Sequence, residues 1–292
     1  MFPRSIFTCF ILQHIQTCNH YLHLNNLKRR FAPATSLSLL LAASCFTECE
    51  NRQENLSDLT DSTTLKYEIL RILPHDERAF TEGLEFVNGK LLESTGMNNQ
   101  SWIAEVDPVT GEHHRQITLD KEYFGEGITA VNNKLYQLTY REKTGFVYDA
   151  LTYKKLGEFH YDWEGWGMTH DDEHLIISDG TDKLRFIDTT TLKVVRTIRV
   201  RDTQNIAVKN INELEYVDGH IFANVYGTPL VIKIAPLTGQ VNGQLDLTAI
   251  TKQIKSAYPN SLELNGIAYD RQQNAFLVTG KYWPHAYLLR IQ

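Results

Sequence analysis

The sequence of 292 residues repeats one short pattern five times, and this repeat restricts the possible folds more than any other feature. The aligned segments are 81–86, 125–129, 165–169, 211–216 and 264–269. Counted from Gly83, Gly127, Gly167, Glu213 and Gly266, consecutive copies are 44, 40, 46 and 53 residues apart. Repeats of about 40–50 residues have the size of one β-propeller blade. The sequence therefore favours a ring of blades over a stack of unrelated β-hairpins.

Each copy continues in a shared register that predicts β-strands. A turn follows the repeated segment, and a second strand is expected at 90–95, 134–139, 174–179, 220–225 and 275–279. Third and fourth strands follow, as at 102–106 and 194–198. Apolar and polar residues alternate and turn residues separate the runs, which is typical of strands rather than helices. One helix is expected, at 247–257.

The fifth copy lacks a fourth strand. Its third strand ends with the run 287–292, whereas the run 67–73 stands before the first copy without a sheet of its own. We therefore predict an all-β fold: a five-bladed β-propeller over residues 65–292, closed by an N-terminal strand that completes the last blade. A closed ring leaves no strand edge free for another molecule, so we expect a monomer.

Residues 1–48 are interpreted as an upstream extension that carries an export signal. A basic stretch at 28–30 precedes an apolar run at 36–45 that is rich in small residues, as in a secretory signal. Cys45 resembles the cysteine of a bacterial lipobox, where a lipid would anchor the protein to a membrane; the alternative is a cysteine that merely follows a signal peptide. The polar residues 49–64 predict a linker. We expect an exported protein, periplasmic or extracellular, with membrane contact only through a lipid at Cys45.

Charge and cysteine content exclude several classes of partner and site. All four cysteines lie within the first 49 residues, so neither disulfides nor CxxC metal sites hold the predicted propeller together. Acidic residues outnumber basic ones by 35 to 29 and the main body has no basic block, which argues against a nucleic-acid partner. The mean hydropathy is −0.32. No run approaches the roughly 20 apolar residues of a membrane-spanning helix.

The predicted ring brings distant residues together. The first strand of each propeller blade lines the central channel, so equivalent positions of different blades converge on one axis. We call the five residues from which the copies were counted (Gly83, Gly127, Gly167, Glu213 and Gly266) the anchors. The residues immediately before them are Glu82, Glu126, Trp166, Asn212 and Asn265. The ends of the second strands add Thr139, Tyr140, Asp179, Tyr226 and Lys281. A concave site with apolar walls and a few convergent polar groups is the expected ligand site.

Glu126 is the strongest candidate for chemistry. It lies between two glycines and follows Tyr123 and Phe124, so we expect aromatic surface beside its carboxyl group and Glu82 close to it. Burial and a neighbouring negative charge both raise the pKa of a carboxyl group, which favours a proton donor near neutral pH. The glycines themselves have a structural explanation in close backbone packing.

Several motifs, in order and with matching spacing from about Tyr67 to Gln292, resemble one known family. They lie at 79–84, 93–96, 123–129, 135–139, 165–167, 178–180, 212–215, 264–268 and 278–284. This pattern is similar to the plant and bacterial type of glutaminyl-peptide cyclotransferase. The resemblance implies a five-bladed propeller and an aminoacyltransferase activity. In that reaction an N-terminal glutamine of a peptide or protein closes on its own side-chain amide, giving pyroglutamate and ammonia.

The resemblance also implies roles for individual residues. The family's proton-shuttling glutamate corresponds to Glu126. Asn212 would donate to the developing oxyanion, and Lys281 would support the same negative charge or the substrate backbone. The remaining substrate-binding residues would be Phe80, Phe124, Trp166, Tyr140, Tyr226 and Glu82. Asn265 is added to them by its position in the ring. Glu82 replaces a glutamine of plant members and would hold the substrate ammonium. Tyr140 and Tyr226 replace tryptophans, which keeps aromatic walls but adds hydroxyl groups.

No cofactor is expected, although a structural cation such as calcium on the propeller axis stays open. The main body shows no His, Cys or carboxylate cluster at zinc spacing. One alternative function is a metal-dependent propeller hydrolase of the lactonase kind, in which Glu82, Glu126, Asn212 and Asn265 would surround a calcium ion. The other is a propeller without catalytic activity that binds a protein or a glycan.

Overall fold

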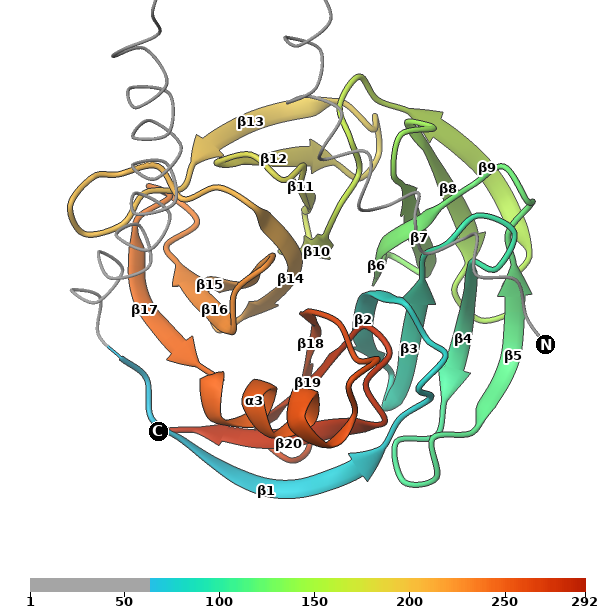
Figure 1. Ribbon diagram of the computed structural model, residues 1–292. Coiled ribbons are helices and arrows are strands. Elements are labelled where there is room, and N and C mark those ends of the chain that lie inside the picture. The colour runs from blue at the N-terminus through green and yellow to red at the C-terminus, as the bar shows by residue number, and fades with distance from the viewer. Residues whose placement is uncertain (1–63) are drawn as a thin grey trace, which may run out of the picture. The chain divides into compact units, whose positions relative to one another are not determined.

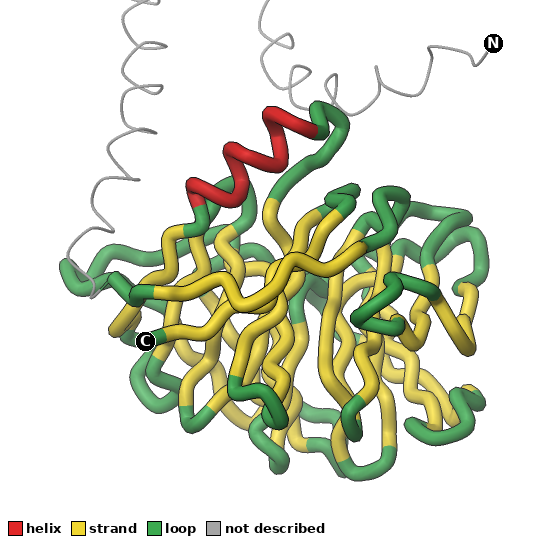
Figure 2. The backbone as a smooth tube through the Cα atoms, turned by 90° about the horizontal axis from the view of Figure 1, so that it is seen from below, coloured by secondary structure: helices red, strands yellow, loops and turns green. Residues whose placement is uncertain are grey.

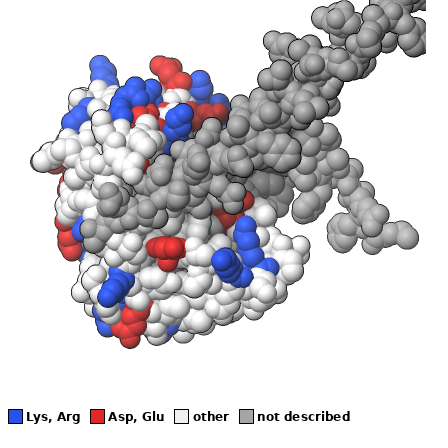
Figure 3. Space-filling model, turned by 60° about the vertical axis from the view of Figure 1, so that its left-hand side comes forward, with Lys and Arg blue, Asp and Glu red and all other residues white. Residues whose placement is uncertain are grey.

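The computed structural model describes residues 64–292. The export signal predicted in residues 1–48, Cys45 and all of the predicted linker except Thr64 lie outside the described residues. Within 64–292, no helix is long and apolar enough to cross a bilayer. Acidic and basic side chains both occur on the face drawn in Figure 3, among uncharged residues.

The described chain forms five four-stranded antiparallel sheets around one axis (Figure 1). The first blade contains β2 (Thr81–Val87), β3 (Lys90–Thr95), β4 (Trp102–Val106) and β5 (His113–Thr118). The second contains β6 (Gly125–Val131), β7 (Lys134–Thr139), β8 (Thr144–Asp149) and β9 (Lys155–His160). The third contains β10 (Met168–His170), β11 (His174–Ser178), β12 (Lys183–Asp188) and β13 (Val194–Arg199). The fourth contains β14 (Ile211–Val217), β15 (His220–Val225), β16 (Leu230–Ile234) and β17 (Val241–Asp246).

The fifth blade joins the two ends of the described chain. It contains β18 (Leu264–Asp270), β19 (Ala275–Gly280), β20 (His285–Ile291) and β1 (Tyr67–Pro74). Its outermost strand, β1, pairs antiparallel with β20, from Tyr67 opposite Ile291 to Pro74 opposite His285. The five-bladed β-propeller predicted from the repeat is confirmed.

Five apolar clusters fill the spaces between neighbouring blades, one at each interface. The middle strands therefore bury both faces, and β11 carries four successive buried residues. Such strands read as continuous apolar runs. The outermost strands have one face toward solvent and carry more exposed residues, as in β13. The position of a strand relative to the interfaces between blades thus decides whether apolar and polar residues alternate along it.

The inner strands approach each other closely at the axis. A side-chain carbon added to Gly167 would lie 2.1 Å from the carbonyl oxygen of Asn212, and one added to Gly127 would lie 2.5 Å from the amide nitrogen of Met168. Only glycine permits these contacts between backbones. The fourth blade has Glu213 at the corresponding anchor. Its carboxylate accepts backbone hydrogen bonds from two other blades, at Leu84 (3.2 Å) and Ile267 (2.7 Å).

The predicted helix is observed as α3 (Thr248–Ala257), between β17 and β18 (Figures 1 and 2). Its buried residues Ile250 and Ile254 are four positions apart and therefore share one face. That face packs in the cluster that also contains Trp283. The helix thus supports the turn after β19, which carries Lys281.

Candidate active site

Four of the five inner strands are irregular at their beginning, where they carry the predicted ring residues. The pairing register shifts across Glu82 in β2, Glu126 in β6, Asn212 in β14 and Asn265 in β18. Such β-bulges re-aim a side chain and are common beside active sites. In the third blade, Trp166 takes the equivalent position just before β10. Four of the five ring residues therefore lie at equivalent backbone irregularities, which the sequence pattern did not reveal.

Buried hydroxyl groups bond the backbone at two of these bulges, those of Glu126 and Asn212. Ser94 donates to the carbonyl oxygen of Glu126 (2.6 Å), and Ser178 donates to that of Asn212 (2.7 Å). Each serine comes from the second strand of the preceding blade. Gly125 in turn donates its amide to the hydroxyl of Ser101 (2.9 Å). Because the backbone groups released by the bulges are satisfied, the ring side chains are free to face the mouth.

A buried ion pair lies at the centre of the site. Lys281 forms a salt bridge with Glu82, and the two side chains are only 4% and 3% exposed. Asn265 donates from Nδ2 to the other carboxylate oxygen of Glu82 at 3.1 Å. Burial raises the pKa of Glu82, while the positive charge of Lys281 acts in the opposite direction. We call the place where Glu82, Glu126, Lys281 and Asn265 meet the hub. The sequence predicted these residues near one another but gave no sign that the lysine pairs with the acid.

Glu126 lies beside this pair as a second carboxyl group. It is 5% exposed. Burial raises the pKa of Glu126 well above its ordinary value, and the negative charge of Glu82 raises it further, against the opposing effect of Lys281. The arrangement favours the protonated form of Glu126, whereas Glu82 is paired with the lysine.

The amide of Asn212 is a buried polar group without a partner for its oxygen. Asn212 is 3% exposed, and its Oδ1 atom has no hydrogen-bond partner among the described residues. An unsatisfied buried oxygen costs about 1–3 kcal/mol. A ligand that donates to this oxygen would remove the cost, so this amide is a candidate for binding a polar group of a substrate.

Six aromatic residues, the aromatic collar, surround the acids: Tyr282, Phe80, Phe124, Tyr140, Trp166 and Tyr226. Taken in that order, the centres of neighbouring rings are 5.2, 5.9, 5.8, 6.4 and 5.8 Å apart. The Nζ atom of Lys281 lies 4.2 Å from the ring centre of Phe80 and 6.0 Å from that of Tyr226, which completes the circuit. The collar shields the acids from solvent.

Tyr282 is a collar residue that sequence reasoning missed. Its backbone has a φ of 60°, which is unusual for a bulky residue and marks local strain. Its amide donates to the carbonyl oxygen of Ala79 (2.8 Å), which fixes the turn after β19 against the segment that carries Phe80. The signal available in the sequence was only its place next to Lys281.

The structure brings the predicted acids, Lys281, Asn265 and the predicted aromatic residues into one contact network, with Asn212 at the equivalent inner-strand bulge. Two other residues expected nearby have structural partners. Asp179 forms a salt bridge with Arg185 at 2.6 Å, and Thr139 bonds the carbonyl oxygen of Thr144. Within residues 64–292, no group of three or more His, Cys, Asp or Glu side chains is placed to hold a metal ion.

Comparison with known proteins gives this site a family. The family model described as glutamine cyclotransferase matches residues 38–291. A glutaminyl-peptide cyclotransferase of Arabidopsis thaliana is 36% identical over 228 residues, which are 77% of this chain and 71% of the plant protein. The chain belongs to the glutamine cyclotransferase family.

A solved structure of this family supports the same assignment. The crystal structure of Myxococcus xanthus glutaminyl cyclase has a TM-score of 0.74 to this chain at 31% identity, and the match covers 80% of this chain and 99% of that one. The family resemblance predicted from the motifs is therefore confirmed.

Proposed function

We propose that this protein is a glutaminyl-peptide cyclotransferase, which converts an N-terminal glutamine of peptides or proteins into pyroglutamate with release of ammonia. The observation that carries the proposal is the pair of buried, neighbouring acids Glu126 and Glu82 beside Lys281, inside the aromatic collar. This site offers a proton donor, a negative charge and a positive charge inside a ring of aromatic side chains. Membership of the family and the names of the two relatives agree with this activity.

Binding orients the reacting groups. The α-amino group of the substrate enters beside the carboxylate of Glu82, which attracts its positive charge. The collar surrounds the glutamine side chain and excludes water, which strengthens the polar contacts inside. An enzyme that folds the side chain back onto the amine converts the reaction into a well-oriented unimolecular step.

Ring closure then needs one proton to move between two nitrogen atoms. The neutral α-amine attacks the side-chain carbonyl carbon, a C–N bond forms, and the carbonyl electron pair moves to oxygen. Lys281 and the Nδ2 group of Asn212 donate to this oxyanion and stabilise it. When the oxyanion collapses, the bond to the side-chain nitrogen breaks. Glu126 gives its proton to the departing nitrogen, which leaves as ammonia, and regains one from the attacking nitrogen.

Lys281 also weighs against the lactonase-like alternative. That function needs a divalent cation among Glu82, Glu126, Asn212 and Asn265. In the structure the ammonium group of Lys281 already binds the carboxylate of Glu82, so a second cation there would be repelled. The carboxylates on the axis below the site bond backbone amides instead, as Glu213 does.

The reaction type is tested with three synthetic peptides that differ only at the first residue. The purified protein should release ammonia from a peptide that begins with glutamine, and the product should lose the mass of one ammonia. The same peptide with N-terminal asparagine or with an acetylated glutamine should not react, because the first cannot close a five-membered ring and the second has no free amine. Equal ammonia release from all three would identify an amidase, and none from any would refute the proposed function.

A further inference from the structure

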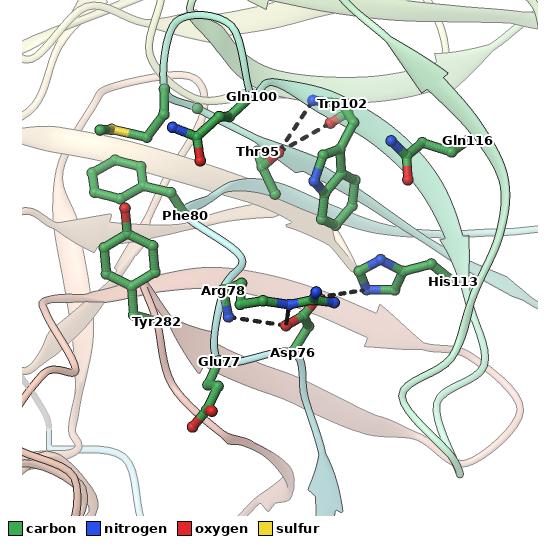
Figure 4. A pocket seen from close by; sticks show the side chains of 12 residues that line it. Asp76, Glu77, Arg78, Phe80, Thr95, Gln100, Trp102, His113, Gln116 and Tyr282 are labelled. Atoms are coloured by element: carbon green, nitrogen blue, oxygen red, sulfur yellow. Dashed lines mark hydrogen bonds and ion pairs between the residues drawn. The ribbon is translucent and has the colours of Figure 1, made fainter. Parts of the chain in front are cut away.

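A second cavity adjoins the aromatic collar over the first blade (Figure 4). Its volume is about 520 Å³, within the range of about 300–1,000 Å³ that is usual for ligand sites. It lies between the segment that joins β1 to β2, the loop after β3 and the strands β4 and β5. Two collar residues, Phe80 and Tyr282, form its wall on the side of the hub. The hub and this cavity are therefore neighbours separated by two aromatic rings.

The indole of Trp102 offers an aromatic surface in this cavity. In Figure 4 the ring projects toward the middle of the cavity, opposite Phe80 and Tyr282. Its centre is 4.5 Å from that of the His113 ring, which supports it from behind. Trp102 is half-buried and does not belong to any of the five apolar clusters between the blades. A tryptophan that faces a cavity rather than the core is suited to stacking against a ligand.

The charges at the edge of the cavity do not favour an acidic ligand. The guanidinium of Arg78 donates to both carboxylate oxygens of Asp76, from Nε and Nη2, each at 2.9 Å. This pair compensates the positive charge of Arg78. The exposed carboxylate of Glu77 adds a negative charge to the same rim. An uncharged side chain with a large apolar surface matches these surroundings better than an aspartate or a glutamate.

The course of a bound peptide leads toward this cavity. The reacting amine and side-chain amide must both lie at Glu82, Glu126 and Lys281, so the rest of the peptide has to leave the hub past the collar. Phe80 stands at that boundary, because Lys281 lies 4.2 Å from its ring centre while its edge packs on Tyr282, at the cavity. A chain that passes Phe80 enters the cavity directly.

We propose that this cavity binds the residues that follow the N-terminal glutamine, and that it prefers an aromatic or large apolar second residue stacked on Trp102. The inference rests on the proposed function and adds a substrate class to it. Glutaminamide carries no second residue and does not reach the cavity. It therefore serves as an internal reference for chemistry at the hub.

The test compares kcat/KM for glutaminamide, Gln-Phe-Ala and Gln-Gly-Ala. The wild-type protein should prefer Gln-Phe-Ala over Gln-Gly-Ala by about tenfold, the size expected for one good aromatic contact. Trp102→Ala should reduce this ratio to about twofold or less and leave glutaminamide unchanged. The matched control Tyr153→Ala truncates an aromatic residue of the second blade outside the cavity and should keep the wild-type ratio.

A second variant keeps the test decisive if Trp102→Ala does not fold. Gln100 is exposed and reaches into the cavity, so Gln100→Trp should fill the space and lower kcat/KM for both tripeptides at least fivefold, without affecting glutaminamide. An unchanged Phe-to-Gly ratio in Trp102→Ala, or equal losses on glutaminamide and the tripeptides in either variant, would overturn the subsite. Failure of the wild-type protein to act on glutaminamide and on both tripeptides would instead refute the proposed function, and the subsite with it.

Discussion

Replacement of Lys281 by methionine tests whether the hub is held by a desolvated ion pair. The two side chains are 4% and 3% exposed, so the substitution leaves Glu82 buried with one donor from Asn265 and with Glu126 as a neighbour. Removing one member of a buried ion pair typically costs about 3–5 kcal/mol. In a domain of this size each kcal/mol lowers the melting temperature by roughly 2–4 °C, so a decrease of about 6–20 °C is expected.

Protonation of Glu82 limits this loss of stability and makes it depend on pH, which gives the test a second measurable effect. Without the lysine the pKa of Glu82 rises further, so the variant should be least stable at alkaline pH and closer to the wild type at acidic pH. The double variant Glu82→Gln/Lys281→Met removes both charges and should recover most of the stability. Thermal unfolding followed by circular dichroism measures all three proteins. If the single and double variants are equally stable within about 0.5 kcal/mol, the two charges do not interact in the folded protein and the reasoning is refuted.

Three further results are expected. The dependence of kcat/KM on pH should be bell-shaped, because the α-amine must lose its proton, with a pKa of about 7.7–8.0, while Glu126 must keep its own. A rate that only rises with pH would contradict a donor role for Glu126. Burial and the charge of Glu85 raise the pKa of Glu215 well above its ordinary value, so Glu215→Gln should increase the free energy of unfolding at about pH 8 and have little effect at about pH 4. Urea titrations at the two pH values check this, and equal effects at both would rule it out. Tyr282→Gly should raise KM yet cost less stability than Tyr282→Ala, because glycine adopts a φ of 60° without strain; the opposite order of melting temperatures would disprove the strain.

The fold was predictable because its information is local and repeated. Five copies of one pattern fix the number of blades, and each copy carries its own turn residues and apolar runs. The same copies place Glu82, Glu126, Trp166, Asn212 and Asn265 at equivalent positions, so their convergence follows from the ring alone. The helix α3 was also predicted, since it interrupts the longest interval between copies.

The parts that could not be predicted depend on contacts between distant residues. Lys281 and Glu82 belong to different blades, and no spacing rule joins them. Glu213 stands where the four other blades have glycine. Only the structure shows its carboxylate bonded to the backbones of Leu84 and Ile267 across the axis. The β-bulges likewise arise from pairing between strands, which a single strand's sequence does not display. Tyr282 resembled any aromatic residue of a blade until its ring was seen beside Phe80.

The most direct test of the account measures ammonia release from a glutamine-initiated peptide by the wild-type protein, Glu126→Gln and Glu173→Gln. Glu173 is an exposed glutamate outside the site and provides the matched control. Glu126→Gln keeps the shape of the buried group but cannot move a proton, so kcat should fall by at least about 10² while the melting temperature is maintained. Glu173→Gln should match the wild type. A Glu126→Gln protein that is folded and as fast as the wild type would contradict the proton shuttle on which the proposed mechanism depends.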